Sequence, residues 1–399
     1  MKLEVLIMSK YKFGDFAINC TEKKIPSPED YSTYIGLEHM DTKCLKISRW
    51  GSDVPIIGEK LIMHKGDILL GKRNAYLRRA AIAPHDGIFS AHGMILRPKE
   101  EIVDYDFFAL FIASDYFFDE AIRISVGSLS PTINWKDLKE LEFYLPDLET
   151  QRKLAKTLWS INDTLDSYKE MLKQSDELVK AKFIEMFGTP IDNEKNWKTI
   201  KVSDICDILN GYAFKSSDYV EKSEIYNCRM SNIRPNGEFD INYNAKFLPE
   251  AFWDKYSQYQ LKNGDIIIAM TDMAGDPKIL GVPTEIKTQG KKMLLNQRVG
   301  KLIFNDSTKF NKLFIRYYLS HYKIRQELVK GATKSIQVNV GKETILNLPI
   351  FVAPIELQNN FICFAQRIDK SKLNIQECIT KLETLYKKII NKYLTKEEN

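Results

Sequence analysis

The stretch KGDILL at residues 65–70 recurs as NGDIII at residues 263–268, and this pair of hydrophobic runs decides the fold. Each copy follows an apolar segment and precedes a polar loop. Further along, FFALF at residues 107–111 and LFIRYY at residues 313–318 both open a segment with the pattern of an apolar helix. Because the matching stretches keep the same order and similar spacing, the chain is interpreted as a tandem duplication of a unit of about two hundred residues.

The downstream half of each copy repeats the same succession of features. A glycine turn and a polar stretch, GSLSPTI at residues 127–133 or GATKSIQ at residues 331–337, lead to an apolar strand. That strand ends in a proline, within YLP at residues 144–146 or VAP at residues 352–354. LETQ at residues 148–151 or IELQ at residues 355–358 then opens a long helix. We therefore expect two α/β units, each followed by a long helix.

Both predicted helices place apolar residues at alternating steps of four and three, the a and d positions of a coiled coil. The first seam consists of Leu154, Leu158, Ile161, Leu165, Tyr168 and Leu172, and the second of Phe361, Phe364, Ile368, Ile375, Cys378, Leu382, Leu385 and Ile389, with Ser371 as a polar exception. A helix of about forty residues is on the order of 60 Å long. Each helix could pack on its own unit alone, but two matched seams of similar length favour pairing with each other.

The predicted fold class is α+β, with four consecutive parts. These are an α/β unit at residues 1–147, a helix at 148–188, a second α/β unit at 189–353 and a second helix at 354–394. Gly188 and Pro190 end the first helix, because glycine suits a C-cap and proline cannot continue the helix. The second unit opens with GYAFK at residues 211–215, a turn that leads into a polar loop.

Composition sets the broad class of protein. The 399 residues exceed one ordinary core, and a hydrophobic content of 44% supports buried cores. No apolar run approaches the length that crosses a bilayer, and the early acid Glu4 argues against a signal peptide. The six cysteines are scattered without a Cys-x-x-Cys pair, which indicates reduced thiols in the cytoplasm rather than disulfides or a zinc site. The net charge of +5 does not by itself imply nucleic acid.

Local clusters of cations are more informative than the net charge. The first unit has a basic loop directly after its hydrophobic run, and lysine and arginine neutralise phosphates while arginine and asparagine also bond base edges. The candidate DNA-binding residues of this unit are Lys72, Arg73, Asn74, Tyr76, Arg78 and Arg79, together with Ser128 and Ser130 of the glycine turn. A solvated basic turn would have the same composition, but its place after a buried strand, repeated in the second unit, favours DNA.

The second unit has the same frame with different loop chemistry. Its loop at residues 270–278 is less basic, and its cations lie further along, with Lys287 and Gln297 beside the candidates. The candidate DNA-binding residues here are Thr271, Lys278, Lys291, Lys292, Asn296 and Arg298, the polar-basic cluster Arg229, Asn232 and Arg234, and Lys334 and Gln337 of the turn that also holds Ser335. The cluster at residues 229–234 could equally be a structural loop. Different loops on one frame are what a reader of two different half-sites needs.

Motifs for catalysis are nearly absent from the sequence. There is no Walker loop, no Gly-x-Gly-x-x-Gly fingerprint, no Asn/Asp-Pro-Pro-Tyr/Phe run, and no metal-ligand spacing among the histidines. One loose match remains, Asp276 followed by Glu285 and Lys287, which resembles the carboxylates and lysine of a nuclease. The first unit lacks an equivalent, and a metal site needs further oxygen ligands.

Taken together, these motifs resemble the specificity subunits of Type I restriction-modification enzymes over essentially the whole chain. The resemblance rests on the two Gly-Asp-Ile runs at residues 66–68 and 264–266, on Leu145–Pro146 with the Glu-Thr-Gln that opens the first helix, on residues 183–188, and on GYAFK. It implies two target recognition domains, each reading one half of a split double-stranded DNA site, and two long helices that run antiparallel as a coiled coil and set the gap between the half-sites.

The resemblance also implies the partners. Two methyltransferase (modification) subunits would bring S-adenosylmethionine and methylate adenine, and restriction/translocase subunits would use ATP and Mg²⁺. This chain would bind no cofactor or metal and carry no catalytic residue. Two rival hypotheses stay open at this point, a self-contained sequence-specific endonuclease or methyltransferase and a coiled-coil adaptor with no DNA role.

Overall fold

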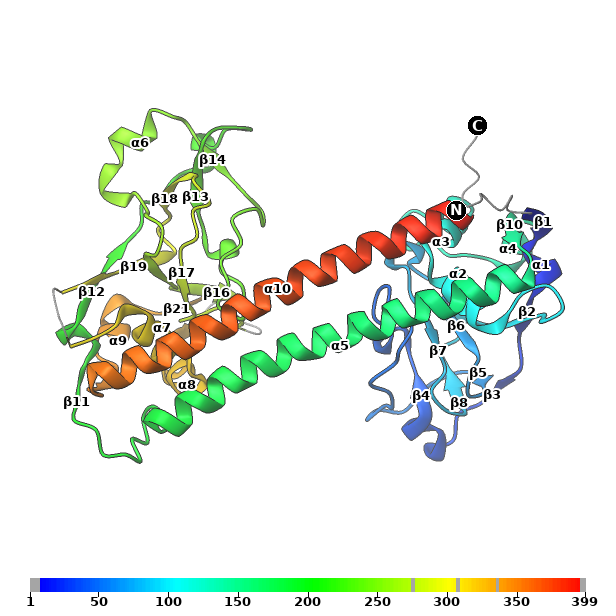
Figure 1. Ribbon diagram of the computed structural model, residues 1–399, viewed down its shortest axis with the longest axis horizontal. Coiled ribbons are helices and arrows are strands. Elements are labelled where there is room, and N and C mark those ends of the chain that lie inside the picture. The colour runs from blue at the N-terminus through cyan, green and yellow to red at the C-terminus, as the bar shows by residue number, and fades with distance from the viewer. Residues whose placement is uncertain (1–7, 274–276, 306–308, 335–336, 395–399) are drawn as a thin grey trace. The chain divides into compact units, whose positions relative to one another are not determined.

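The computed structural model describes residues 8–273, 277–305, 309–334 and 337–394. Contacts divide the chain into two compact units, Met1–Met171 with Asn374–Asn399 and Leu172–Leu373. Figure 1 shows each unit as a group of short strands and helices together with a stretch of both long helices, α5 (Leu148–Phe187) and α10 (Ile355–Leu394).

The first unit is built from two four-stranded sheets and one strand pair. Their orders are β2–β9–β6–β7, β3–β5–β8–β4 and β1–β10, and all pairs are antiparallel except the parallel pair β4–β8. The elements are β1 (Met8–Lys12), α1 (Phe13–Phe16), β2 (Ala17–Cys20), β3 (Lys23–Lys24), β4 (Tyr34–Ile35), β5 (Lys60–Met63), β6 (Ile68–Gly71), β7 (Ala80–Ile82), β8 (Gly87–Phe89), β9 (Gly93–Pro98), α2 (Tyr105–Ala113), α3 (Asp115–Arg123), α4 (Trp135–Leu138) and β10 (Glu142–Pro146).

The second unit repeats the main sheet and the strand pair of the first, whereas its other sheets differ. Its main sheet has the order β12–β19–β15–β17, and its second sheet β14–β13–β18 contains the parallel pair β13–β18. β11 pairs with β22, and β21 pairs with both β16 and β20. The elements are β11 (Thr199–Lys201), β12 (Cys206–Asn210), β13 (Ile225–Cys228), β14 (Phe247–Leu248), α6 (Phe252–Lys255), β15 (Ile266–Ala269), β16 (Thr271–Met273), β17 (Pro283–Glu285), β18 (Lys292–Leu295), β19 (Val299–Phe304), α7 (Lys312–Ser320), α8 (Tyr322–Lys330), β20 (Thr333–Lys334), β21 (Gln337–Asn339), α9 (Lys342–Leu346) and β22 (Pro349–Phe351).

The repeated Gly-Asp pair forms the same turn at the start of β6 and of β15. Gly66 and Gly264 have positive φ angles of 93° and 82°, which glycine adopts without strain. The Asp67 carboxylate accepts the backbone N–H of His64 at 2.8 Å and pairs with Arg97 of β9, with an Oδ2–Nη2 distance of 2.9 Å. Asp265 accepts the N–H of Lys262 at 2.7 Å and pairs with Lys301 of β19 at 2.6 Å. The motif that first indicated the duplication therefore shapes the main sheet.

Clustered aromatic rings fill the core beneath each main sheet. In the first unit the Phe13 ring lies 5.4 Å from that of Phe117 and 6.0 Å from that of Phe143, and all three side chains are fully buried. In the second unit the rings of Phe187 and Phe314 lie 4.8 Å apart. Each fully buried phenylalanine stabilises the fold by roughly 2–3 kcal/mol, so each unit has a substantial core of its own.

A buried glutamine in the first turn of each long helix ties that helix to its unit. The Gln151 side chain accepts the backbone N–H of Asp104 at 2.8 Å and donates to the carbonyls of Ile102 at 3.1 Å and Pro146 at 2.8 Å. Gln358 repeats this pattern, accepting from Asn311 at 2.9 Å and donating to Lys309 and Ala353. Asp104 and Asn311 are the N-cap residues of α2 and α7. The glutamine of the LETQ and IELQ stretches thus hydrogen-bonds three backbone groups of its unit.

Replacing either glutamine should therefore lower the stability of the fold. We expect Gln151→Ala to lower the free energy of unfolding by about 3 kcal/mol, because it leaves buried backbone groups without a hydrogen-bond partner. Urea titration followed by circular dichroism would measure this loss. Gln376→Ala is the matched control, since Gln376 is exposed in the middle of α10; equal losses for the two variants would contradict the role assigned to Gln151.

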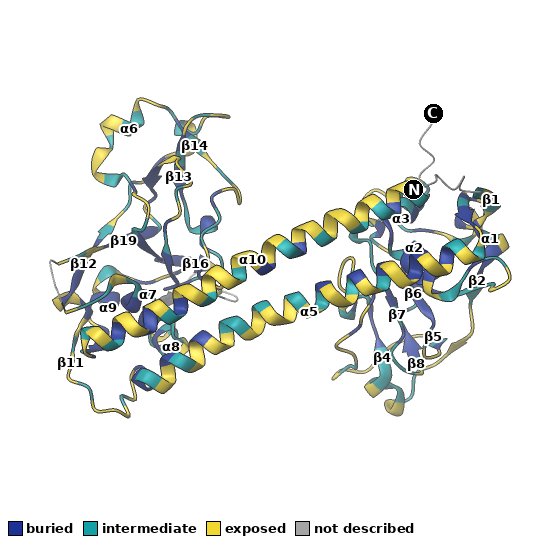
Figure 2. Cartoon of the chain, viewed as in Figure 1, coloured by how far each residue is buried: buried dark blue, intermediate teal, exposed yellow. Residues whose placement is uncertain are grey.

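The long helices are each 40 residues long. Figure 2 shows buried turns of both helices alternating with exposed ones. Leu154, Leu158, Ile161 and Leu165 of the expected first seam are buried. The second seam differs near its end, where Leu385 is 46% exposed while Ile379 and Ile390 are buried. Ile390 lies in the first unit's core cluster with Leu154 and Leu158, so packing on that cluster decides which positions are buried there.

Candidate nucleic-acid interface

The loop after β6 carries most of the residues predicted for the first unit. The N–H groups of Lys72 and Arg73 both donate to the carbonyl of His92, at 3.2 and 3.3 Å. The carbonyl of Lys72 accepts the N–H of Ile133 at 3.0 Å, and Ala75 donates to Pro131 at 3.2 Å. These bonds join the loop to the polar stretch before α4.

Ser130 links the side chains of this loop. Its hydroxyl donates to Oδ1 of Asn74 at 2.8 Å and accepts Nε of Arg73 at 2.9 Å. Arg73 is exposed, Tyr76 is 56% exposed, and Ser128 is exposed at the adjoining turn. The structure thus joins three residues predicted from two distant stretches, and the terminal nitrogens of Arg73 make no hydrogen bond among the described residues.

Two arginines of the same loop have different surroundings. Arg78 has a positive φ of 48°, and its guanidinium pairs with Asp115 at 2.7 Å and Asp119 at 2.6 Å on α3. Nε of Arg79 is buried without a hydrogen-bond partner among the described residues. Both side chains are partly buried, so in this arrangement Arg78 holds the loop against α3.

The equivalent loop of the second unit begins with Met270, which makes the same backbone bonds as Lys72. Its N–H donates to the carbonyl of Arg298 and its carbonyl accepts the N–H of Val340, both at 3.0 Å. Next to it, the buried Thr271 hydroxyl donates to Oδ1 of Asn339 at 2.7 Å. The two loops therefore occupy the same place in two similar units while their side chains differ.

The predicted cluster at residues 229–234 is largely engaged within the second unit. Asn232 is 3% exposed; its Oδ1 accepts the N–H of Arg229 at 2.9 Å and its Nδ2 donates to the carbonyl of Asp240 at 2.9 Å. The Arg234 guanidinium lies 4.0 Å from the ring centroid of Tyr243. Of the two interpretations left open for this cluster, the buried asparagine corresponds to the structural loop.

The remaining candidates of the second unit are spread over several elements. Lys278, Lys291 and Lys292 are exposed, with Lys291 3.7 Å from Glu224 and Lys292 over the ring of Trp253. Asn296 is buried and Arg298 partly buried. Gln337 is a partly buried residue of β21, and the backbone of Lys334 belongs to β20. Residues 274–276, with Asp276, and residues 335–336, with Ser335, lie outside the described residues.

The structure also identifies residues that the sequence did not single out. A cavity of about 400 Å³ in the first unit is lined by Lys72 and, from other elements, by Asn19, Lys23, Asn134 and Trp135. The only sequence signal was the lysine pair at residues 23–24.

The described residues contain no group of three or more His, Cys, Asp or Glu side chains that could hold a metal ion. Glu285 of the loose nuclease match lies on β17, and its proposed companion Asp276 is not described. No helix within the described ranges is both long and apolar enough to cross a membrane.

The fold and the site define a duplicated α/β protein that carries two similar loop clusters with different side chains. The sequence profile described as the Type I restriction modification DNA specificity domain matches residues 28–175 and 194–387. The chain belongs to this family, which confirms the resemblance noted from its motifs.

Named relatives support the assignment. The chain is 26% identical over 404 residues to the Type I restriction enzyme MjaVIII specificity subunit of Methanocaldococcus jannaschii, covering 96% of this chain and 91% of the relative. It is 22% identical to the putative type I restriction enzyme MjaX specificity subunit of the same organism, covering 83% of this chain and 78% of the relative.

Two solved structures share the fold. A chain from a study of assembly and conformational transition of the type I R-M system has a TM-score of 0.55 at 18% identity and 98% coverage of both chains. The S subunit of a Type-I restriction-modification system from M. genitalium has a TM-score of 0.56 at 13% identity, covering 99% of this chain and 98% of that one. The expected mixed α/β class with long helices is confirmed.

Proposed function

We propose that this chain is the DNA sequence-specificity subunit of a Type I restriction-modification system, and that its two units are target recognition domains for the two halves of a split site. One observation carries the proposal. The loops that begin at Lys72 and at Met270 have the same backbone bonds and follow equivalent strands of two main sheets of the same order, but they present different side chains. A protein that reads two different half-sites requires one frame with two different reading surfaces.

The long helices form the frame in this proposal, as an antiparallel coiled coil that sets the gap between the half-sites. Contacts inside each unit support it. In the second unit the rings of Phe183 on α5 and Phe361 on α10 lie 5.4 Å apart, and Lys372 pairs with Asp176 at 2.6 Å. In the first unit Tyr386 of α10 hydrogen-bonds Asn162 of α5, and burial raises the pKa of Tyr386 to about 12.

Chemistry belongs to the partner subunits in this proposal. Two methyltransferase subunits would bind S-adenosylmethionine and methylate adenine, and restriction/translocase subunits would use ATP and Mg²⁺. The chain itself would be non-catalytic, would hold no cofactor, and would work in the cytoplasm, where the DNA is. The relatives named above are specificity subunits, so the rival of a self-contained endonuclease or methyltransferase is not favoured.

The test is to reconstitute the chain with an adenine methyltransferase partner from the same genome. We expect the complex to methylate one bipartite sequence, mapped by methylome sequencing, and to retard that DNA with an affinity that falls linearly on a logarithmic scale as salt rises. Exchanging the first unit for that of a relative should change one half-site and leave the other unchanged. Metal-dependent cutting or methyl transfer by the purified chain alone, lost in Glu285→Ala, would overturn the proposal.

A further inference from the structure

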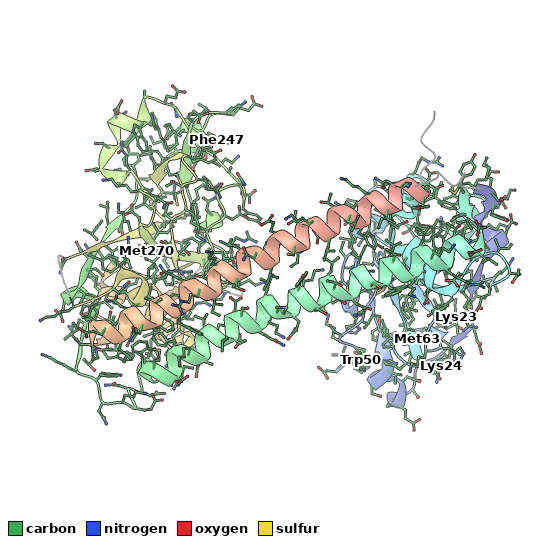
Figure 3. The ribbon with its side chains drawn as sticks, in the orientation of Figure 1. Lys23, Lys24, Trp50, Met63, Phe247 and Met270 are labelled. Carbon is green, nitrogen blue, oxygen red and sulfur yellow. The ribbon has the colours of Figure 1, made fainter. Side chains whose placement is uncertain are left out.

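The cavity of the first unit combines cations with neutral polar groups. It opens where β2 ends, beside β3, the loop after β6 and the start of α4, and no aspartate or glutamate of the described chain lines it. Its polar and aromatic lining consists of Asn19, Thr21, Lys23, Lys72, Asn134 and Trp135. Figure 3 labels Lys23 and Lys24 on this unit. Such a lining is suited to an anion.

Lys72 is held at this cavity by backbone bonds on both sides. Its N–H donates to His92 and its carbonyl accepts from Ile133, so the main chain is fixed and the side chain lines the cavity. The ammonium makes no hydrogen bond or ion pair with any residue that the structure describes, although the side chain is partly buried. Burial first, and the charge of Lys23 second, lower the pKa of Lys72. Burying an ammonium partly without a counterion costs free energy, and a bound anion would offset that cost.

The second unit shows that the fold does not need this cation. Met270 stands in the equivalent position and is 7% exposed. A Cβ built on Gly300 of β19 would lie 2.9 Å from the Met270 sulfur, so this side chain packs against the sheet. Gly300 lies opposite Ile268, the third residue of β15, and Met94 lies opposite Leu70, the third residue of β6. Met94 is therefore the residue of the first unit that corresponds to Gly300. In the first unit a methionine thus stands on the strand and a lysine in the loop, whereas in the second unit a glycine stands on the strand and a methionine in the loop.

We propose that this cavity is a phosphate-binding pocket, with Lys72 as the main cation and Asn19, Thr21 and Asn134 as neutral donors. Lys23 also lines it, and its Nζ lies 3.6 Å from Oε2 of Glu59. Lysine offers a point charge rather than a planar fork, which suits phosphate oxygens more than a particular base edge. The volume of about 400 Å³ leaves room for the sugar attached to the phosphate. The ligand is assigned as a backbone phosphate of bound DNA at the half-site of the first unit, and this assignment rests on the proposed function.

The DNA arm of the test uses the complex with methyltransferase subunits. We expect Lys72→Met to weaken binding roughly tenfold for cognate and unrelated duplexes alike, and to lower the slope of log affinity against log salt by about 0.9. Lys72→Arg should keep both values. Lys136→Gln is the matched control, because Lys136 is exposed on α4 and does not line the cavity. Lys72→Met should fold normally, as methionine occupies the equivalent position in the second unit.

A second arm separates DNA from free phosphate. Thermal unfolding of the complex is followed while inorganic phosphate replaces chloride at constant ionic strength. A rise in Tm that Lys72→Met removes, with unchanged DNA binding, would identify free phosphate as the ligand and retain the pocket. No effect of Lys72→Met in either arm would overturn the pocket while leaving the proposed function intact. A wild-type complex with no preference for any bipartite site would instead contradict the proposed function, and the phosphate arm would still report on the pocket.

Discussion

Insertion of seven residues into both long helices, after Met171 in α5 and after Leu373 in α10, is expected to lengthen the spacer of the recognised site by about three base pairs. Seven residues preserve the heptad phase and add on the order of 10 Å of helix, against roughly 3.4 Å per base pair. Both half-sites should keep their sequences, because the loops that begin at Lys72 and at Met270 are unchanged. Affinity for the original site should fall by at least about a hundredfold, since one half-site no longer meets its domain.

Methylome sequencing of cells that carry the variant and its methyltransferase partner would read the new spacer directly. Insertion into α5 alone should abolish binding to every bipartite site, because the seam would lose its register. A seven-residue insertion between Ile57 and Gly58 is the control, since Ile57 is 89% exposed and lies outside both helices. An unchanged spacer in the double insertion would show that the helices do not set it.

Much of the fold could be predicted from the sequence because its main motifs occur twice, once in each unit. The helices expected at residues 148–188 and 354–394 correspond to α5 and α10, which begin within one residue of those positions. The Gly-Asp pairs and the two glutamines were visible as repeated letters. Their physical reasons, a left-handed turn and hydrogen bonds to three backbone groups, required the structure.

The site could be predicted less well, because burial and partners depend on residues far along the chain. Arg78 looked like a free cation, but its partners Asp115 and Asp119 lie on α3. Asn232 belonged to a cluster that could be a base reader or a structural loop, and it is buried with hydrogen bonds to the carbonyls of Asp240 and Tyr243. Residues from five separate stretches of the chain line the cavity, and no local sequence pattern predicts that they lie together.

Lys72 and Arg73, which are adjacent in the loop after β6, have distinct surroundings and should have distinct roles. Lys72 is partly buried at the cavity, whereas Arg73 is exposed and fixed through one nitrogen by Ser130. Fixing Nε leaves the two outer nitrogens of Arg73 as a pre-oriented pair of donors. Two parallel donors are what the O6 and N7 acceptors of guanine in the major groove require.

Arg73→Lys is therefore expected to reduce the preference for the cognate half-site of the first unit by roughly 10- to 100-fold at one base pair, since a bidentate contact contributes about 1–3 kcal/mol of discrimination. Lysine keeps the charge but cannot form the planar fork, so the salt dependence should stay the same. Ser130→Ala should produce a smaller loss in the same direction by releasing Nε. Competition binding against duplexes that carry each base pair in turn would measure the preference at every position.

Arg123→Lys on α3 is the matched control, because that arginine is exposed and pairs only locally, with Glu120 at 2.6 Å, among the ion pairs described for it. The decisive comparison is with Lys72→Met. A base-reading arginine changes specificity without changing the salt slope, whereas a phosphate-binding lysine changes the slope without changing specificity. If Arg73→Lys instead weakened all sequences equally, Arg73 would be a backbone contact, and the specificity of the first unit would have to lie in other residues of the loop.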